Sequence, residues 1–223
     1  MPSRVTKQSD ASGETLLAAL GGHDAVEIVE RYDGFMDASR FNATLYLAPF
    51  RGWPRHHRRA MRYARGRVLD VGCGGGRVVL HLQERHQEVV AIDISPGAIE
   101  ACRRRGVRDA RLLSIDEIEE SLGPFDTIVM LGNNFGLFAN ARKAKRLLRR
   151  FYRLTTARGR IIAETRDVSQ TDDPADLRYQ AQNRLRGRMT GQIRIRVRVR
   201  FRERATPWFD YLMVSQSELT QTP

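Results

Sequence analysis

Short apolar runs alternate with amphipathic segments through the middle of the chain. Each apolar run has the length of a strand, and the five expected strands are 68–71, 88–93, 110–113, 125–131 and 160–165. The segment Ala141–Leu154 repeats apolar residues every three or four positions, with arginines opposite them, and therefore predicts a helix. Strands that alternate with helices of this length predict an α/β fold with a doubly wound, mainly parallel sheet.

The N-terminal part departs from this alternation. Residues 1–22 are polar except for one short apolar patch, which predicts a frayed tail with at most one helical turn. Residues 25–50 mix aromatic and acidic side chains ahead of the sheet. This pattern suits a helical cap over a ligand and a plain packing helix equally well.

The C-terminal part changes pattern again. Residues 166–191 are polar and irregular, which predicts a long connection. Residues Ile193–Phe201 then alternate strictly between apolar residues and arginines, the period of a half-buried strand. A turn at Thr206-Pro207 and a second strand at 208–214 complete an antiparallel hairpin, and a helix begins near Ser215.

These patterns divide the chain into three parts. Residues 1–54 are an N-terminal tail and helical cap, 55–165 are a ligand-binding core, and 166–223 are a substrate-side insertion with an arginine-rich hairpin. The core begins with a helix in which His56 and His57 are adjacent. Neighbouring helical residues point in different directions, so we expect two solvated histidines that do not share a metal ion.

A glycine turn follows the first predicted strand of the core. The strand ends in Asp70, glycines stand at alternate positions 72, 74 and 76, and a helical pattern starts at Arg77. Strand, tight turn and helix in this order form the opening of a Rossmann-like sheet, in which the backbone approaches a nucleotide closely. The dinucleotide fingerprint G-x-G-x-x-G requires a third glycine where Arg77 stands. The pattern here is instead D-x-G-x-G-x-G.

This turn, together with Asp93 at the end of the second predicted strand, resembles that of the class I S-adenosylmethionine-dependent methyltransferases. The resemblance covers about residues 66–165, so it implies that 55–165 is a Rossmann-like core that binds S-adenosylmethionine. Four further segments resemble a group of bacterial small methyltransferases of unassigned substrate. They are 33–35, 131–136, 164–167 and 207–210.

The resemblance implies S-adenosyl-L-methionine as the cofactor and S-adenosyl-L-homocysteine as its product. Asp70 and the glycine turn would hold the methionine part, and Asp93 would accept both ribose hydroxyls, as a carboxylate with two acceptor oxygens can. Ile94 would lie against the adenine and Asp116 near the adenine amine. Leu131 and Gly132 would lie beneath the sulfonium. The implied cofactor-binding residues are Asp70, Gly72, Cys73, Gly74, Gly76, Asp93, Ile94, Asp116, Leu131 and Gly132.

Methyl transfer from a sulfonium needs little acid–base machinery when the acceptor is electron-rich. Positioning at about 3 to 3.5 Å and exclusion of water supply most of the effect, so the sequence names no obligatory catalytic residue. We expect an N, O or C nucleophile on a small-molecule acceptor. The candidates for orienting it are Asn133, Asn134, Asp37, Tyr46, Arg166 and Tyr179. Turn formation explains the two asparagines equally well, and a structural ion pair explains Arg166 better than a carboxylate clamp does.

The formal net charge is +12, which favours polyanionic partners. However, only three of the 38 basic residues are lysines, and the rest are arginines. A GC-rich coding sequence gives such a bias, so we favour this origin of the charge over a nucleic-acid-binding surface. The row Arg194, Arg196, Arg198 and Arg200 is expected to be the wet face of a half-buried strand, because no aromatic residues alternate with it. An RNA methyltransferase and a non-catalytic nucleotide-cofactor-binding protein are the alternatives.

The remaining features bear on location and extent. Cys73 and Cys102 form no metal or disulfide pattern, no window is apolar enough to span a membrane, and residues 1–13 lack the apolar segment of a secretory signal. We therefore expect a cytoplasmic protein without a metal or a membrane partner. Sheets of this class usually end in a further helix and two strands. Either the hairpin replaces these strands or the sequence is truncated at Pro223, and we favour truncation, which would leave an exposed sheet edge. The oligomeric state is left open.

Overall fold

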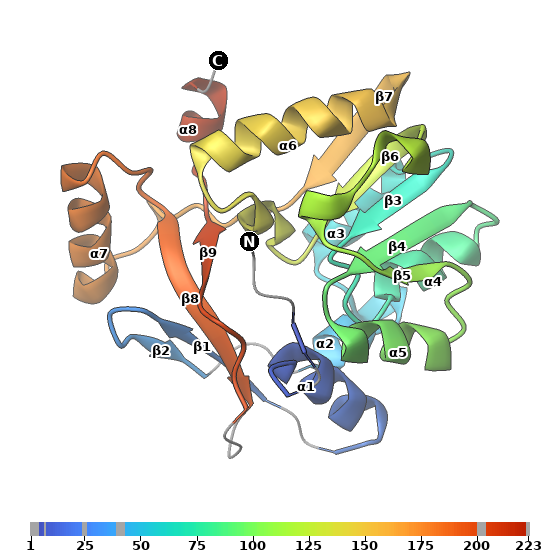
Figure 1. Cartoon of the computed structure of the whole chain (residues 1–223), viewed down its shortest axis with the longest axis horizontal. Helices are drawn as coiled ribbons and strands as arrows, with labels where there is room; N and C mark the ends of the chain where they lie inside the picture. Colours follow the sequence, from blue (N-terminus) through green and yellow to red (C-terminus); the bar gives the residue numbers. More distant parts are fainter. Residues whose placement is uncertain (1–4, 7, 24–25, 39–42, 200–203, 222–223) are drawn as a thin grey trace.

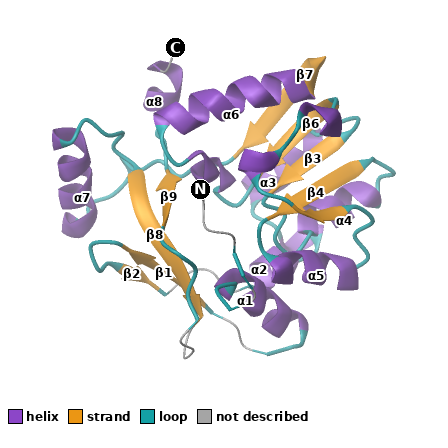
Figure 2. Cartoon of the chain, viewed as in Figure 1, coloured by secondary structure: helices purple, strands orange, loops and turns teal. Residues whose placement is uncertain are grey.

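The structure, a computed structural model, describes residues 5–6, 8–23, 26–38, 43–199 and 204–221. Its strands form two separate sheets (Figure 2). One sheet is parallel, with the order β5-β4-β3-β6-β7, and the other is antiparallel, with the order β2-β1-β8-β9. The predicted α/β, doubly wound, Rossmann-like fold is confirmed.

The parallel sheet carries helices on both faces (Figure 1). Its strands are β3 (Val68–Val71), β4 (Val89–Asp93), β5 (Ala110–Leu112), β6 (Phe125–Met130) and β7 (Thr155–Ala163). One face packs against α6 (Ala141–Leu154), whose Leu147 and Phe151 are fully buried. The other face packs against α3 (Arg55–Ala60), α4 (Arg77–Gln83) and α5 (Pro96–Arg104). Side chains along each strand therefore pack alternately into one or the other of two apolar cores, as expected for strands buried on both faces.

Side-chain caps begin three helices around the core. For two of them the sequence predicts the cap: Ser95, followed by Pro96, and Asp116. Ser95 caps α5 by accepting from the amide of Ala98, and Pro96 occupies the first turn, as predicted. Asn140 caps α6 in the same way. The expectation that Asp116 caps the following short helix is wrong, because Ser114 does so in a capping box with Glu117.

Several connections between the helices and strands around the core contain short 3₁₀ helices. They are η1 (Phe50–Gly52), η2 (Met61–Tyr63), η3 (Ile115–Glu117), η4 (Glu120–Leu122) and η5 (Asn134–Phe138). The fifth strand of the core, β7, begins at Thr155 rather than at Arg160 as expected. It follows α6 directly, and Thr155 already pairs with Phe125 of β6 across a bulge.

The antiparallel sheet joins the two ends of the chain. Its strands are β1 (Glu27–Arg31), β2 (Met36–Asp37), β8 (Gln192–Val199) and β9 (Phe209–Leu212). The predicted hairpin of β8 and β9 is confirmed, with Ile195 opposite Phe209. The expected helical cap is wrong for residues 27–37, because β1 pairs with β8 from Glu27↔Val199 to Arg31↔Ile195. In Figure 1 the blue and orange strands lie side by side although they are far apart in sequence.

The predicted frayed N-terminal tail is also wrong. Residues Ala11–Leu20 form the ten-residue helix α1, which packs against α5 and β8. Asp10 fixes it in place, because one carboxylate oxygen accepts from the amide of Gly13 (3.0 Å) and the other from the amide of Gly97 in α5 (2.7 Å). A second short helix, α2 (Thr44–Leu47), follows β2. The N-terminal part is therefore helical on either side of a β-hairpin.

A helix was missed in the polar connection. Residues Pro174–Leu185 form α7, with Asp173 as the N-cap and proline in the first turn. The start signal is present in the sequence, but few apolar residues recur at helical spacing behind it. The predicted helix after Ser215 is present as α8 (Gln216–Gln221). No helix in the described part of the chain is both long and apolar enough to cross a membrane.

The arginines of β8 lie on the face of the antiparallel sheet opposite Ile195 and Val199. Arg196 and Arg198 both bind the carboxylate of Glu30, at 2.7 and 3.4 Å. Aromatic rings, absent from the strand itself, come from neighbouring segments: Arg196 lies 4.6 Å from the ring of Trp208. Arg200 falls outside the described residues. The row is thus a half-exposed face whose charge is partly neutralised.

The fold predicts that Asp10→Ala destabilises the chain by about 2 kcal/mol. The change removes a helix cap, worth about 1 kcal/mol, and leaves the buried amide of Gly97 without an acceptor. Chemical denaturation measures the loss. Ser9→Ala, one residue away in an exposed turn, serves as the control and should stay within about 0.5 kcal/mol of wild type. Equal stability of the two variants would contradict the role given to Asp10.

Candidate active site

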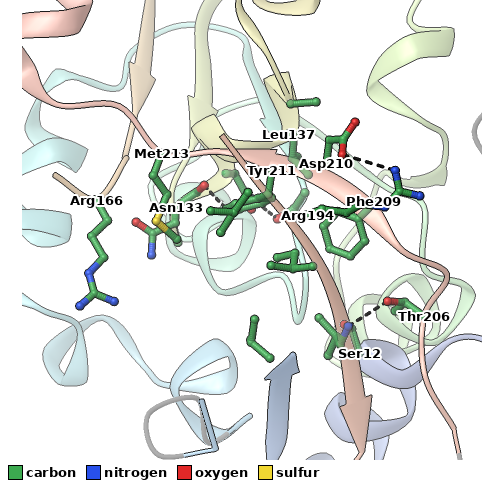
Figure 3. Close-up of a pocket in the computed structure, with 18 of the residues that line it drawn as sticks. Ser12, Asn133, Leu137, Arg166, Arg194, Thr206, Phe209, Asp210, Tyr211 and Met213 are labelled. Atoms are coloured by element: carbon green, nitrogen blue, oxygen red, sulfur yellow. Dashed lines mark hydrogen bonds and ion pairs between the residues drawn. The ribbon is translucent and has the colours of Figure 1, made fainter. Parts of the chain in front are cut away.

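A cavity of about 1720 Å³ separates the two sheets. It is lined by the carboxyl ends of β3, β4 and β6, by the inner face of the antiparallel sheet, and by residues of α1 and α7. Figure 3 shows the part bounded by Tyr211, Phe209 and Asn133. Pockets for one small molecule usually measure about 300–1,000 Å³, so this cavity has room for two ligands side by side.

The glycine turn after β3 forms one wall of the cavity. Gly72 has a positive φ of 72°, and its amide donates to the carbonyl of Ile92 at 2.9 Å. The side-chain amide of Asn134 donates to the carbonyls of Val71 (2.9 Å) and Gly72 (2.8 Å). A Cβ atom at Gly72 would lie 2.5 Å from this amide nitrogen. The turn therefore requires glycine for conformation and for space.

Asp93 lies at the end of β4 beside this turn. One carboxylate oxygen accepts from the amide of Gly74 and the other from the amide of Ser95, both at 2.9 Å. Burial raises the pKa of Asp93, and these two amides oppose the shift. A carboxylate oxygen accepts more than one hydrogen bond, so both oxygens keep capacity for donors from a ligand. This geometry suits the predicted contact with two ribose hydroxyls.

Asp70 is the least satisfied acid in the described part of the cavity wall. Its carboxylate is buried, and Oδ2 has no hydrogen-bond partner. Burial raises the pKa of Asp70 to about 7, while the nearby Arg77 opposes the shift. An orphaned buried acceptor costs about 1–3 kcal/mol, which a ligand donor would recover. The ammonium group of the methionine part of the cofactor is such a donor, so the residues present fit this group.

The other predicted cofactor residues surround the same space. Ile94 is 48% exposed beside Asp93, although it is a large apolar residue, and is free to contact an adenine. Asp116 also lines the cavity, but its carboxylate already binds Lys143 (2.7 Å) and Arg146 (3.0 Å). Nine of the ten predicted cofactor-binding residues line the cavity: Asp70, Gly72, Cys73, Gly74, Asp93, Ile94, Asp116, Leu131 and Gly132. Gly76 is not among them and instead stands at the start of α4 with a φ of 74°.

All six candidates for orienting the acceptor line the cavity. They are Asn133, Asn134, Asp37, Tyr46, Arg166 and Tyr179. The carbonyl of Asn133 accepts from the hydroxyl of Tyr211 at 2.5 Å, a bond visible in Figure 3. The ring of Tyr179 lies 4.5 Å from the guanidinium of Arg31. The structural ion pair expected for Arg166 does not form within the described residues, and its side chain is exposed to one side of Asn133 (Figure 3).

A hydrogen-bond network centred on Glu164 holds the loop after β6. One carboxylate oxygen of Glu164 accepts from the amides of Gly132 (2.5 Å) and Asn133 (3.1 Å) and contacts Nε2 of His57 (2.7 Å). The other contacts Nε2 of His56 (2.9 Å). Burial raises the pKa of Glu164, but the bonds from His57, His56 and the loop amides outweigh burial and hold it at about 2.

This network overturns the interpretation of the histidines. His57 is buried rather than solvated, and both rings reach the same carboxylate despite being adjacent. The ligand atoms of His56, His57 and Glu164 lie within 4.8 Å of one another, as a metal site would require. However, Arg77 donates to Nδ1 of His57 at 3.1 Å, so the proton of the neutral ring is on Nε2 and points at Glu164. The described contacts therefore favour hydrogen bonding over metal coordination.

Sequence reasoning missed Glu164 as a site residue, along with Tyr211. Glu164 closes the last strand of the core, so the signal was an acid at the carboxyl end of a parallel strand, as for Asp70 and Asp93. Tyr211 has no comparable signal, because its role depends on the hairpin facing the core.

Comparison with known proteins agrees with this geometry. A family model described as a methyltransferase domain matches residues 68–159. The ubiquinone biosynthesis O-methyltransferase of Xylella fastidiosa (strain 9a5c) is 38% identical over 71 residues, which cover 29% of this chain and 29% of that protein. Its counterpart from Xanthomonas oryzae pv. oryzae (strain PXO99A) is 34% identical over 74 residues, covering 30% and 31%. The matches span less than a third of these curated relatives.

Solved structures extend the likeness over the whole chain. A SAM-dependent methyltransferase from Bacteroides fragilis, crystallised with S-adenosyl-L-homocysteine, is 26% identical and has a TM-score of 0.82. That alignment covers 99% of this chain and 87% of that one. A Methanosarcina mazei protein, 17% identical with a TM-score of 0.54, shares the fold over 75% of this chain and 81% of its own. Residues 68–159 therefore match a methyltransferase domain, the chain has the fold of an S-adenosylmethionine-dependent methyltransferase over almost its whole length, and its cofactor is S-adenosylmethionine.

Proposed function

We propose that this chain transfers a methyl group from S-adenosylmethionine to an N, O or C nucleophile of a small-molecule acceptor in the cytoplasm. The observation that carries the proposal is the cavity shared by two different walls. One wall is the glycine turn with its two carboxylates, and the other is a sheet whose apolar and aromatic residues stand among paired charges such as Arg31. The first suits the cofactor and the second suits an uncharged acceptor of moderate size.

The bound cofactor supplies a methyl carbon on a positively charged sulfur, which becomes a neutral thioether on transfer. The residues of the chain position the two partners. Asp93 and Asp70 present acceptors to the ribose and the ammonium group, and the loop held by Glu164 forms the floor between the walls. The antiparallel sheet excludes water from the acceptor side. Proximity and water exclusion are the main sources of rate for this reaction type.

The geometry supports a small acceptor more than RNA. Arg196 and Arg198 of β8 lie on the outer face of the antiparallel sheet and are bound to Glu30, while Arg194 lines the cavity close to Asp210. The parts of the chain take distinct roles in this scheme: 55–165 binds the cofactor, while 1–54 and 166–223 together enclose the acceptor. The two cysteines are free and buried, which fits a reducing cytoplasm.

The proposal is tested with labelled S-adenosylmethionine and the low-molecular-weight fraction of a bacterial extract. We expect label in small molecules that is lost when excess S-adenosylhomocysteine is added. Label confined to RNA in whole extract would support the RNA alternative instead. Binding of S-adenosylhomocysteine without any transfer would favour a non-catalytic cofactor-binding protein.

Asp93→Ala is predicted to weaken binding of S-adenosylhomocysteine at least about 100-fold. Two hydrogen bonds from ribose hydroxyls to a charged group are worth about 1.5–3 kcal/mol each, and 1.4 kcal/mol is a factor of ten. Isothermal titration calorimetry measures the change. Asp109→Ala removes a carboxylate that pairs with Arg111 outside the cavity, so its affinity should equal that of wild type. If Asp93→Ala bound S-adenosylhomocysteine as tightly as wild type, the ribose could not bind at Asp93.

The raised pKa of Asp70 predicts that the affinity for S-adenosylhomocysteine depends on pH. With its pKa raised to about 7, the ligand-free carboxyl is mostly protonated at pH 6 and mostly ionised at pH 8. A cationic ammonium group binds the ionised form, so affinity should rise about tenfold over these two pH units and level off above them. The rise should be missing in Asp70→Asn. A variant that retains the wild-type pH profile would assign the titration to another group.

A further inference from the structure

Glu27 is a carboxylate in an otherwise apolar part of the acceptor wall. It lies on the inner face of β1 opposite Val199, and the neighbouring pair on that face is Val29↔Val197. Glu27 is 7% exposed and lines the cavity. Neither the cofactor-binding residues nor the candidates for orienting the acceptor account for it.

The charges of β1 are otherwise neutralised. Arg31 binds Asp33 (2.8 Å) and Asp176 (2.5 Å), and Glu30 on the outer face binds Arg196 and Arg198. Glu27 forms no ion pair within the described residues. A buried charge without a counterion is costly, so a buried acid in this position stays protonated or meets a partner from outside the chain.

The groups that face Glu27 come from three elements. Ser12 of α1 donates a hydrogen bond to its carboxylate, Tyr46 of α2 lies within electrostatic range, and β8 contributes Val199. Burial raises the pKa of Glu27 to about 7, and the bond from Ser12 opposes the shift. The carboxyl therefore changes protonation state near neutral pH, where a general base is most effective.

Tyr46 connects this carboxyl with the methyl-donor end of the cavity. Its ring edge lies 4.0 Å from where a Cβ of Gly132 would stand, and Gly132 is the residue predicted beneath the sulfonium. Tyr46 is also within electrostatic range of Tyr211 and Glu164, which hold the loop at Gly132 and Asn133. Glu27 and Gly132 thus line the same cavity, and Tyr46 interacts with the first and lies near the second.

We propose that Glu27 is the general base of the transfer and that the acceptor is a largely apolar molecule with a hydroxyl or amine nucleophile. This inference rests on the proposed function. The oxygen or nitrogen lone pair forms the new bond to the methyl carbon as the carbon–sulfur bond breaks, and its electron pair stays on sulfur. The proton of the nucleophile passes to the Glu27 carboxylate and then to solvent.

The wall around Glu27 indicates the rest of the acceptor. Apolar and aromatic side chains of three strands line it: Val29, Ile193, Ile195, Val197, Phe209 and Tyr211. Such a surface gains most from a ring or branched hydrocarbon, since burial is worth about 25 cal/mol per Å² of apolar area. Arg31 and Arg194 also line this wall, and each lies beside an acid, Asp33 and Asp210 respectively.

The first test needs neither cofactor nor acceptor. Protein labelled with ¹³C at the glutamate carboxyls is titrated by NMR, so that aspartates such as Asp70 stay silent. We expect one glutamate resonance with a midpoint near pH 7, absent in Glu27→Gln and retained in Glu30→Gln. The proposal would be overturned if every glutamate titrated below about pH 6, close to the ordinary pKa of a glutamate side chain.

The second test measures transfer of label to the low-molecular-weight extract. Glu27→Gln should bind S-adenosylhomocysteine like wild type but transfer methyl groups about 10²–10⁴-fold more slowly, the usual contribution of a general base. At saturating S-adenosylmethionine, where the pH-dependent affinity due to Asp70 no longer affects the rate, its rate should also lose the rise between pH 6 and 8. Glu27→Asp should recover part of the rate, and Glu30→Gln, a neighbouring acid outside the cavity, should keep the wild-type pH profile.

The outcomes separate the two proposals. Wild-type protein that binds no S-adenosylhomocysteine, or that transfers no label, overturns the proposed function and the base with it. Wild-type transfer that is matched by Glu27→Gln at every pH overturns Glu27 alone. Loss of cofactor affinity in Glu27→Gln would also contradict the proposal, because it would place Glu27 in the cofactor site.

Discussion

The pairing of β1 with β8 determines the acceptor side of this molecule. Five residue pairs join strands that lie more than 160 positions apart, and they place the inner face of the antiparallel sheet opposite the carboxyl edge of the parallel one. The cavity exists because these two surfaces face each other across it. Because side chains alternate in a strand, a register shift of one residue would turn Glu27 and Arg31 outward and bring the Glu30 carboxylate inside.

Four buried or half-buried acids around the cavity are stabilised in different ways. Asp93 has two backbone amides, and Glu164 has two amides and two histidines. Among the described residues, Asp70 has one oxygen with no partner, and Glu27 has a single hydroxyl and no counterion. Asp93 and Glu164 thus bind groups of the protein itself and stabilise the loops that follow β3, β4 and β6. The last two have protonation states that a ligand can change, which is typical of groups at functional sites.

The cofactor half could be predicted from the sequence, since each of its signals is local. Asp70, the glycine turn and Asp93 all fall within about 25 residues, and a strand–turn–helix unit puts them at one sheet edge wherever it occurs. The acceptor half could not, because β1 was indistinguishable from a packing helix until its partner strand was known. The buried position of His57 was missed for the same reason: its acceptor, Glu164, is 107 residues away.

The two halves are coupled through one residue of the loop after β6. The amide of Asn133 is held by Glu164 at the end of the parallel sheet, and its carbonyl is held by Tyr211 of the antiparallel sheet. Asn133 adopts a left-handed conformation with φ 62°, which is tolerated by asparagine better than by most residues. A displacement of β9 would therefore move Asn133 and, with it, the adjacent Gly132, which is proposed to lie beneath the sulfonium. The antiparallel sheet thus also holds the loop after β6, and a core without this sheet would lack the bond from Tyr211 to that loop.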